Sequence, residues 1–235
     1  MVALSIGGLE RCSFIDFPGA LSAVVFTRGC NLRCGYCHNP VLVSGAAVEG
    51  DPSAADVLGF LRTRQGLLGG VVVSGGEPTL QFDALQNFLE QVRALGFAIK
   101  LDTNGTRPVC LARLLEARLV DRVALDIKDL PEGYADLCAP REPTSVIDES
   151  LELLRGRAVP YELRTTVLWP RHSEERLRQM AARLCLKRGE PWFLQPYRPG
   201  ALLCPNPGWI APDEPVLRQM AARISKDLSV DCAVR

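Results

Sequence analysis

The stretch from Gly70 to Leu101, GVVVSGGEPTLQFDALQNFLEQVRALGFAIKL, contains a complete strand–helix–strand unit. The β-branched run Gly70–Ser74 predicts a buried strand, and Phe97–Leu101 predicts a second one. Between them, apolar residues recur every three to four positions over Phe82–Leu95, which predicts an amphipathic helix. Strands that alternate with helices of this length form βαβ units in a parallel sheet.

The same alternation extends in both directions along the chain. Further strands are expected at Ser22–Phe26, Val123–Ile127, Tyr161–Leu168 and Trp192–Gln195, and further helices at Ala54–Arg64, Leu111–Arg118, Val146–Leu154, Glu174–Leu186 and Glu214–Lys226. Residues 1–21 are expected to extend across the mouth of the fold, and residues 229–235 to form a tail or an edge strand.

Two parallel architectures fit such a pattern. An open doubly wound sheet carries a glycine-rich fingerprint after its first strand, and none follows Ser22–Phe26. A closed barrel uses about 31 residues per βα unit, so residues 22–228 provide six to seven units. We therefore predict a single α/β domain over residues 1–235, built as a partial (β/α)6 barrel.

Composition excludes several classes of function. The chain has 235 residues with 27 basic and 27 acidic side chains, whereas nucleic-acid binding usually needs a basic excess. No apolar run approaches the ~18 residues of a membrane span. Met1–Leu9 does not resemble a signal peptide, and a cytoplasmic protein is expected.

Nine cysteines are many for a cytoplasmic chain, and three of them form a tight C-x3-C-x2-C group: Cys30, Cys34 and Cys37. A structural zinc site needs four ligands, and His38 directly follows Cys37, where joint chelation is awkward. A [4Fe–4S] cluster held by three cysteines leaves one iron free for a small molecule. The spacing favours the cluster and leaves zinc open. The dispersed cysteines are expected to be small buried residues: Cys12, Cys110, Cys138, Cys185, Cys204 and Cys232.

Polar residues follow each predicted strand, at the end where barrel enzymes place their chemistry. After the first two strands come the cysteine group and Gly75-Gly76-Glu77-Pro78. After the later strands come Asp102-Thr103-Asn104-Gly105, Asp126-Ile127-Lys128, Arg164-Thr165-Thr166 and Gln195-Pro196-Tyr197-Arg198. Asp126 and Lys128 share one face of their strand, because alternate residues point the same way.

The cysteine spacing, with Tyr36 before the last cysteine, and the Gly75-Gly76-Glu77-Pro78 run resemble the radical S-adenosylmethionine (SAM) superfamily. The resemblance implies that SAM binds the free iron through its amino and carboxylate groups. It also implies that one electron from the cluster splits the sulfonium bond, and that the resulting 5′-deoxyadenosyl radical removes a hydrogen atom from the substrate.

A narrower resemblance covers nearly the whole chain. Phe14–Gly19, Phe26–Cys30 and Tyr36–Pro40 are similar to the activating enzymes of glycyl-radical enzymes. Ile6–Leu9 and Pro196–Gly200 are most similar to activating proteins of anaerobic ribonucleotide reductase. At position 198 the pyruvate formate-lyase activase pattern has histidine, whereas this chain has Arg198.

The resemblance implies roles for individual residues. Cys30, Cys34 and Cys37 would hold the cluster. SAM contacts would come from Tyr36, Cys37, His38, Gly75, Gly76, Glu77, Asp102, Thr103, Asn104, Arg164 and Arg198, with Asp102 and Thr103 near the SAM carboxylate, in some members through a monovalent cation. Asp126, Lys128 and Asp16 would face the substrate.

Each assignment has a plainer alternative. Glu77 either orients the SAM amino group or fixes its loop, and Arg164 either binds SAM or neutralises a barrel carboxylate. His38 and Asp16 also suit loop and turn positions, and His172 is expected at the surface. No cysteine lies between His38 and Ser74, so a single cluster is expected, with flavodoxin or ferredoxin as the electron donor.

Three functions remain open from the sequence. The leading prediction is installation of a glycyl radical on a large partner enzyme, with anaerobic ribonucleotide reductase as the expected partner. The second is a radical SAM enzyme that acts on a small molecule or peptide, for example one similar to 7-carboxy-7-deazaguanine synthase. The third is a non-enzymatic zinc or electron-carrier module, which would leave the polar strand ends unused.

Overall fold

One curved sheet of eight strands organises the chain, with the strands in sequence order from β1 to β8. The computed structural model describes residues 3–140, 144–200, 203 and 207–235. β1 (Ile6–Ser13) pairs antiparallel with β2 (Ser22–Thr27), and every later pair is parallel. The later strands are β3 (Gly70–Gly75), β4 (Ala98–Thr103), β5 (Arg122–Asp126), β6 (Tyr161–Val167), β7 (Trp192–Pro196) and β8 (Cys232–Val234).

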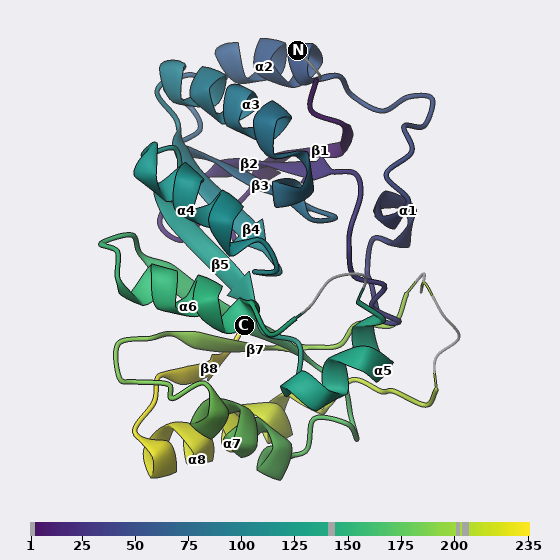
Figure 1. The fold of residues 1–235 in the computed structure, drawn as a ribbon, viewed down its shortest axis with the longest axis vertical. Coiled ribbons are helices and arrows are strands. Elements are labelled where there is room, and N and C mark those ends of the chain that lie inside the picture. The colour runs from purple at the N-terminus through teal and green to yellow at the C-terminus, as the bar shows by residue number, and fades with distance from the viewer. Residues whose placement is uncertain (1–2, 141–143, 201–202, 204–206) are drawn as a thin grey trace.

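Six longer helices cover the outside of the sheet (Figure 1). They are α2 (Ala54–Arg62), α3 (Phe82–Ala94), α4 (Pro108–Glu116), α6 (Ile147–Arg155), α7 (Glu174–Arg183) and α8 (Glu214–Leu228). Two short helices, α1 (Pro40–Val43) and α5 (Tyr134–Cys138), lie apart from them, at the long loop that follows β2 (Figure 1). Short 3-10 turns cover Pro78–Gln81 and Pro131–Gly133.

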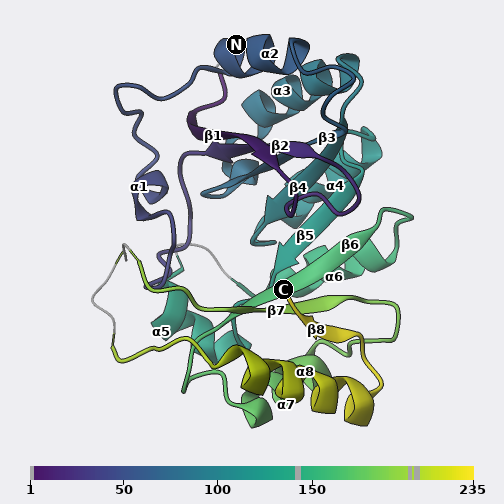
Figure 2. The ribbon, with the colours of Figure 1, turned by 180° about the vertical axis from the view of Figure 1, so that it is seen from behind.

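The sheet does not close on itself. Among the described residues, β1 and β8 are the two end strands and do not pair with each other. Figure 2 shows the two ends of the curved sheet from behind. The prediction of a partial, mostly parallel barrel is confirmed.

Alternation along the strands separates an apolar outer layer from a charged inner one. In β4, Ile99 and Leu101 are fully buried on the face that the helices cover. Lys100 and Asp102 lie on the opposite face, inside the barrel, because alternate residues point the same way. The barrel interior therefore receives polar side chains from strands whose outer face is hydrophobic core.

The structure corrects some sequence expectations. β1 lies inside the predicted N-terminal extension; its residues are mostly half-exposed or exposed, so no apolar alternation marks it. His172 is fully buried rather than at the surface, and its Nδ1 accepts a hydrogen bond from the Leu168 N–H at 3.0 Å. The C-terminal edge strand is confirmed as β8.

The dispersed cysteines differ in how far they are buried. Cys138 and Cys232 are buried as predicted and Cys110 is half-buried. The prediction is wrong for Cys12 and Cys185, which are exposed, and Cys204 lies outside the described residues.

No helix in the described ranges has the length and apolar character needed to cross a bilayer.

Candidate active site

A cavity of about 260 Å³ opens inside the barrel where β3 to β7 end. All of the predicted site residues except Glu77 and Arg198 line it: Asp16, Cys30, Cys34, Tyr36, Cys37, His38, Gly75, Gly76, Asp102, Thr103, Asn104, Asp126, Lys128 and Arg164. A second cavity of about 250 Å³ shares Asp16, His38 and Arg164 and adds Lys100, Arg198 and Arg235. The site is thus two adjoining hollows with common walls.

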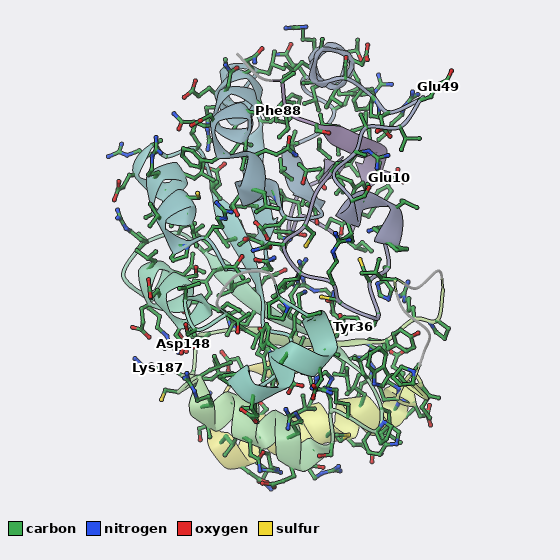
Figure 3. The ribbon with its side chains drawn as sticks, turned by 45° about the vertical axis from the view of Figure 1, so that its right-hand side comes forward. Glu10, Tyr36, Glu49, Phe88, Asp148 and Lys187 are labelled. Carbon is green, nitrogen blue, oxygen red and sulfur yellow. The ribbon has the colours of Figure 1, made fainter. Side chains whose placement is uncertain are left out.

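The segment Gly29–Asn39, here called the cysteine loop, is held by main-chain contacts on two sides. At its start, the Gly29 N–H donates to Leu42 O at 2.7 Å. Further along, the Arg33 N–H donates to Cys138 O at 2.5 Å and the Gly35 N–H to Leu137 O at 3.1 Å. The loop therefore rests on the C-terminal end of α5. Tyr36, a buried residue of this loop, is labelled among the side chains in Figure 3.

Two buried side chains anchor the loop further. Arg28, only 4% exposed, binds Asp51 with two guanidinium nitrogens, one of them at 2.6 Å from Oδ1. The Asn31 side chain donates to Thr106 Oγ1 at 2.7 Å and accepts from Asn104 Nδ2 at 2.9 Å. The second pair of contacts joins the cysteine loop to the loop that follows β4.

The three residues of the cysteine group, Cys30, Cys34 and Cys37, all line the cavity. Cys30 and Cys37 are half-buried, whereas Cys34 is buried with its Sγ 3.3 Å from Cys138 Sγ. In the described part of the chain, no three His, Cys, Asp or Glu side chains surround one metal position. Separate thiols around a hollow suit a multi-iron cluster, whose cysteines bind different irons, better than a zinc ion, whose ligands share one centre.

Burial governs the acidity of these thiols. It raises the pKa of Cys30 to about 12 and raises that of Cys37, while Lys128 opposes both shifts. The hydrogen bond with Cys138 lowers the pKa of Cys34 to about 7, against the effect of burial. Burial disfavours a thiolate without a partner, so Cys30 and Cys37 need a cation to ionise.

Gly75 and Gly76 pack main chain against main chain. Gly75 has φ +113°, and a Cβ there would lie 2.3 Å from Thr27 N. A Cβ on Gly76 would lie 2.0 Å from Gly29 O. Only glycine fits such positions, so the pair sets the spacing between the end of β3 and the start of the cysteine loop as well as lining the cavity.

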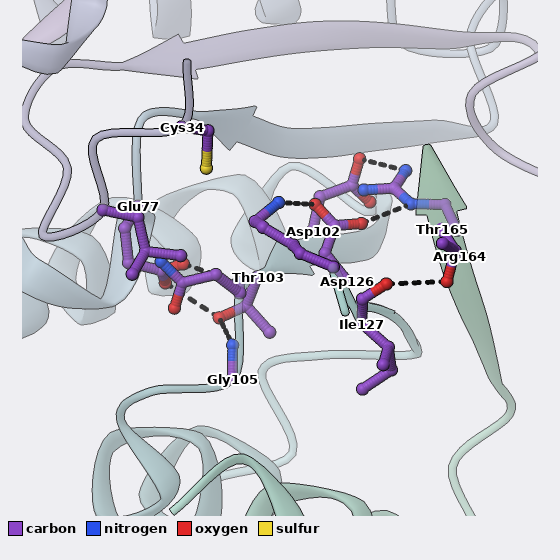
Figure 4. Close-up of polar contacts among 12 residues, drawn as sticks. Cys34, Glu77, Asp102, Thr103, Gly105, Asp126, Ile127, Arg164 and Thr165 are labelled. Carbon is purple, nitrogen blue, oxygen red and sulfur yellow. Dashed lines mark hydrogen bonds and ion pairs between the residues drawn. The ribbon is translucent and has the colours of Figure 1, made fainter. Parts of the chain in front are cut away.

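Glu77 is fully buried and joins the loop after β3 to the end of β4 and the loop that follows it (Figure 4). Its Oε1 accepts from Thr79 N at 3.1 Å, Thr79 Oγ1 at 2.6 Å and Thr103 Oγ1 at 2.8 Å. Its Oε2 accepts from Asn104 N at 2.7 Å. Burial raises the pKa of Glu77, and the donated hydrogen bonds oppose that shift. Both oxygens are thus engaged in fixing the loops after β3 and β4.

Replacing Glu77 with alanine is expected to destabilise the fold by about 2–4 kcal/mol, because buried donors lose a charged acceptor. Urea unfolding measures the change. Glu90→Ala, which removes an exposed glutamate bonded to Gln86 on α3, should cost less than about 0.5 kcal/mol. A loss of SAM affinity in Glu77→Ala with stability unchanged would instead make Glu77 a direct cofactor contact.

Seven charged side chains form a continuous chain of alternating sign through the barrel interior. In order they are Arg235, Glu162, Lys100, Asp102, Arg164, Asp126 and Lys128. Lys100 Nζ lies 2.6 Å from Asp102 Oδ1. The Arg164 guanidinium lies 2.9 Å from both Asp102 and Asp126, and Figure 4 labels these three residues. Four cations and three carboxylates leave one positive charge in excess, which favours an anionic ligand.

Asp126 and Lys128, the last two members of this series of ion pairs, are both kept in their charged forms. Burial works against the ionised form of Asp126, but Arg164 and Lys128 outweigh it and lower its pKa. Burial also works against the Lys128 ammonium, but Asp126 and nearby Tyr36 outweigh it and raise its pKa. A carboxylate held by two cations is a poor proton acceptor, so the pair is better suited to binding a ligand than to proton transfer.

Four further predicted residues line one or both cavities: Asp16, Tyr36, His38 and Arg198. Tyr36 is buried, with its ring edge-on to Trp209 at 6.2 Å. The His38 ring stacks on Tyr197 at 6.3 Å, and Arg198 lines the second cavity. Asp16 Oδ2 accepts from Ser13 Oγ at 2.5 Å, in a turn that places it between the two cavities.

Sequence reasoning did not identify Lys100, Glu162, Arg235, Asn31 or Cys138. Lys100 and Glu162 left a signal, because each is a charge inside an apolar strand at a position that alternation turns inward. Asn31 and Cys138 gave no such signal in the sequence, because their contact partners lie 75 and 104 residues away along the chain.

Known proteins share this sequence pattern and fold. A family model described as the Radical SAM superfamily matches residues 24–184. A candidate glycyl-radical enzyme activating enzyme of Methanocaldococcus jannaschii is 34% identical, with 75% of this chain and 73% of that protein covered. The pyruvate formate-lyase-activating enzyme of Clostridium pasteurianum is 30% identical, with 77% and 76% covered.

Solved structures agree at the level of the fold. A radical SAM methyltransferase from Sphaerobacter thermophilus superposes with a TM-score of 0.69 at 17% identity and covers 95% of this chain and 68% of its own. SuiB of Streptococcus suis, bound to S-adenosylmethionine, superposes with a TM-score of 0.62 at 18% identity over 88% of this chain; the chain spans about half (48%) of SuiB.

These matches confirm the expected cofactors, a [4Fe–4S] cluster and SAM, because they define the family. They also exclude the non-enzymatic zinc or electron-carrier module. The chain therefore belongs to the radical SAM superfamily, in its group of glycyl-radical-enzyme activating enzymes.

Proposed function

We propose that this chain installs a glycyl radical on a partner enzyme by removing a hydrogen atom from a glycine Cα. The observation that supports this most is the arrangement of the two cavities. The first joins the cysteine loop to the barrel charges, and the second continues from it toward Asp16 and Arg198. The two cavities adjoin at lining residues that they share, among them Asp16. A peptide that enters the second cavity beside Asp16 would therefore reach the cysteine loop in the first.

The cysteine end of the site fits the cluster and SAM. Cys30, Cys34 and Cys37 would hold the cluster, and the positive excess of the barrel charges suits the SAM carboxylate. When bound, the reduced cluster would supply one electron to cleave SAM into methionine and the 5′-deoxyadenosyl group, which would accept the glycine hydrogen. Lys128 and Asp126 would orient the reacting groups, and Tyr36 and His38 would line the adenosine.

A protein substrate fits the surface beside the site. Phe14 and Ile15, which precede Asp16, are 83% and 76% exposed, and Ile15 lines the second cavity. Adjacent exposed apolar side chains at a cavity mouth are typical of interaction sites. A glycine in the partner would let its main chain reach the site without a side chain in the way.

Two partners compete. Ile6–Leu9, Pro196–Gly200 and the arginine at position 198 favour anaerobic ribonucleotide reductase, which we propose as the partner. The second candidate is pyruvate formate-lyase, because the C. pasteurianum relative is named for activating it. With no cysteine between His38 and Ser74, a single cluster would receive its electron from flavodoxin or ferredoxin.

Electron paramagnetic resonance tests the proposal. The iron-loaded protein, SAM and a reductant are mixed without oxygen with either enzyme from the organism that encodes the chain. A doublet should appear on the reductase and disappear when its radical-bearing glycine is changed to alanine. A doublet on pyruvate formate-lyase alone would select the second candidate.

Turnover of a free small molecule, with no radical on either large protein, would contradict the proposal. It would indicate the alternative of a radical SAM enzyme for a small molecule or peptide.

A further inference from the structure

The contact between Cys34 and Cys138 joins the cysteine loop to a thiol outside the C-x3-C-x2-C motif. Their sulfurs are 3.3 Å apart, which is hydrogen-bond contact between thiols. Cys138 is fully buried, and Cys34 is 8% exposed and lines the first cavity. We propose that Cys34 and Cys138 form a reversible disulfide in the iron-free protein.

Main-chain hydrogen bonds hold Cys34 next to Cys138. Arg33 and Gly35, on either side of Cys34, donate to the carbonyls of Cys138 and Leu137 at 2.5 and 3.1 Å. At the other end of α5, the Tyr134 hydroxyl accepts from Lys128 N at 2.9 Å. Since a disulfide has its sulfurs about 2.05 Å apart, bond formation needs the sulfurs to approach by only about 1.2 Å.

The sequence spacing alone favours other pairs. Cys30 and Cys37 are four and three residues from Cys34, whereas Cys138 is 104 residues away. In the folded chain it is nevertheless Cys138 whose thiol contacts Cys34. The proposal therefore names a pairing that proximity in sequence would not select.

The chemical step is thiol–disulfide exchange with a small disulfide that enters through the cavity. The Cys34 thiolate attacks one sulfur of the small disulfide, and a mixed disulfide forms as the first thiol leaves. Cys138 loses its proton and attacks Cys34 Sγ, which releases the second thiol. Two protein thiols are oxidised and the small disulfide is reduced to two thiols, so atoms and electrons balance.

The disulfide would remove one of the three thiols that the proposed function assigns to the cluster, and that consequence rests on the proposed function. Oxidation would store the iron-free chain with Cys34 protected from further oxidation. A thiol reductant would return Cys34 to the site before the cluster is built. The disulfide itself does not depend on the proposed function.

The test treats the full-length iron-free protein with oxidised glutathione and traps free thiols with iodoacetamide under denaturing conditions. Mass spectrometry after trypsin should find peptide 34–62 linked to peptide 129–141, about 2 Da lighter than the two free peptides. Peptide 34–62 also holds Cys37, so the same link in Cys37→Ala assigns it to Cys34.

Two variants serve as controls. Cys138→Ala should lose the linked peptide, whereas Cys232→Ala, which removes another buried cysteine, should keep it. Links from Cys34 to Cys30 or Cys37, or a Cys34 that remains free, would overturn the proposal.

Iron binding tests the consequence separately. Oxidised wild-type protein should take up little iron until dithiothreitol is added, whereas wild-type protein that was kept reduced should load at once. If the linked peptide forms but iron uptake is normal, the disulfide proposal stands and its proposed effect on the cluster is wrong. Failure of the glycyl-radical test would leave both results unchanged.

Discussion

Replacing any one of Cys30, Cys34 and Cys37 with alanine is expected to abolish the cluster and all reductive cleavage of SAM. A [4Fe–4S] cluster is normally held by cysteine thiolates, and the loop contains no cysteine besides these three. Anaerobic reconstitution should give about four irons per wild-type chain and close to none in each variant. Release of 5′-deoxyadenosine with dithionite should disappear in parallel.

Cys110→Ala is the matched control, because Cys110 is half-buried on α4 and lies outside both cavities. It should keep its full iron content and its SAM cleavage. Zinc at one per chain without iron, or two clusters per chain, would contradict the assignment.

Replacing Lys100 with methionine is expected to cost about 3–5 kcal/mol of folding stability, because it leaves buried carboxylates with one cation fewer. Lys100 is 1% exposed and lies between Asp102 at 2.6 Å and Glu162 at 3.6 Å. Chemical denaturation under anaerobic conditions measures the change. Lys226→Met, at an exposed position on α8, should change stability by less than about 0.5 kcal/mol.

A double variant sharpens this test. Lys100→Met with Glu162→Gln removes a carboxylate together with its cation, so it should recover part of the stability lost in Lys100→Met. If Lys100→Met is as stable as wild type, the charged chain through the barrel is not a structural element.

The sequence predicted the framework well because each barrel strand is hydrophobic on its covered face. In β3, Val71 and Val73 are buried in the main core, and Val72 is buried on the other face with Phe17 and Val24, so a short β-branched run was a sufficient signal. β1 is the exception, since it pairs with β2 through its main chain while much of it remains exposed. Main-chain pairing of that kind leaves no hydrophobic pattern.

The site was predictable where chemistry is concentrated in short motifs. The cysteine group, Gly75-Gly76 and the residues after β4 and β5 do line one cavity. Which groups neutralise one another was not predictable, because it depends on strand register: Asp126 lies beside Arg164 in the pairing of β5 with β6. The contact of Cys34 with Cys138 depends on the packing of α5, a helix too short for periodicity to reveal.

Transfer of deuterium from a partner glycine to SAM-derived product tests the central claim most directly. The partner enzyme is prepared with glycine deuterated at Cα and is incubated with the iron-loaded protein, SAM and reductant without oxygen. The account predicts 5′-deoxyadenosine that carries one deuterium, formed in step with the glycyl radical. Unlabelled 5′-deoxyadenosine, formed at the same rate whether or not the partner is present, would contradict it.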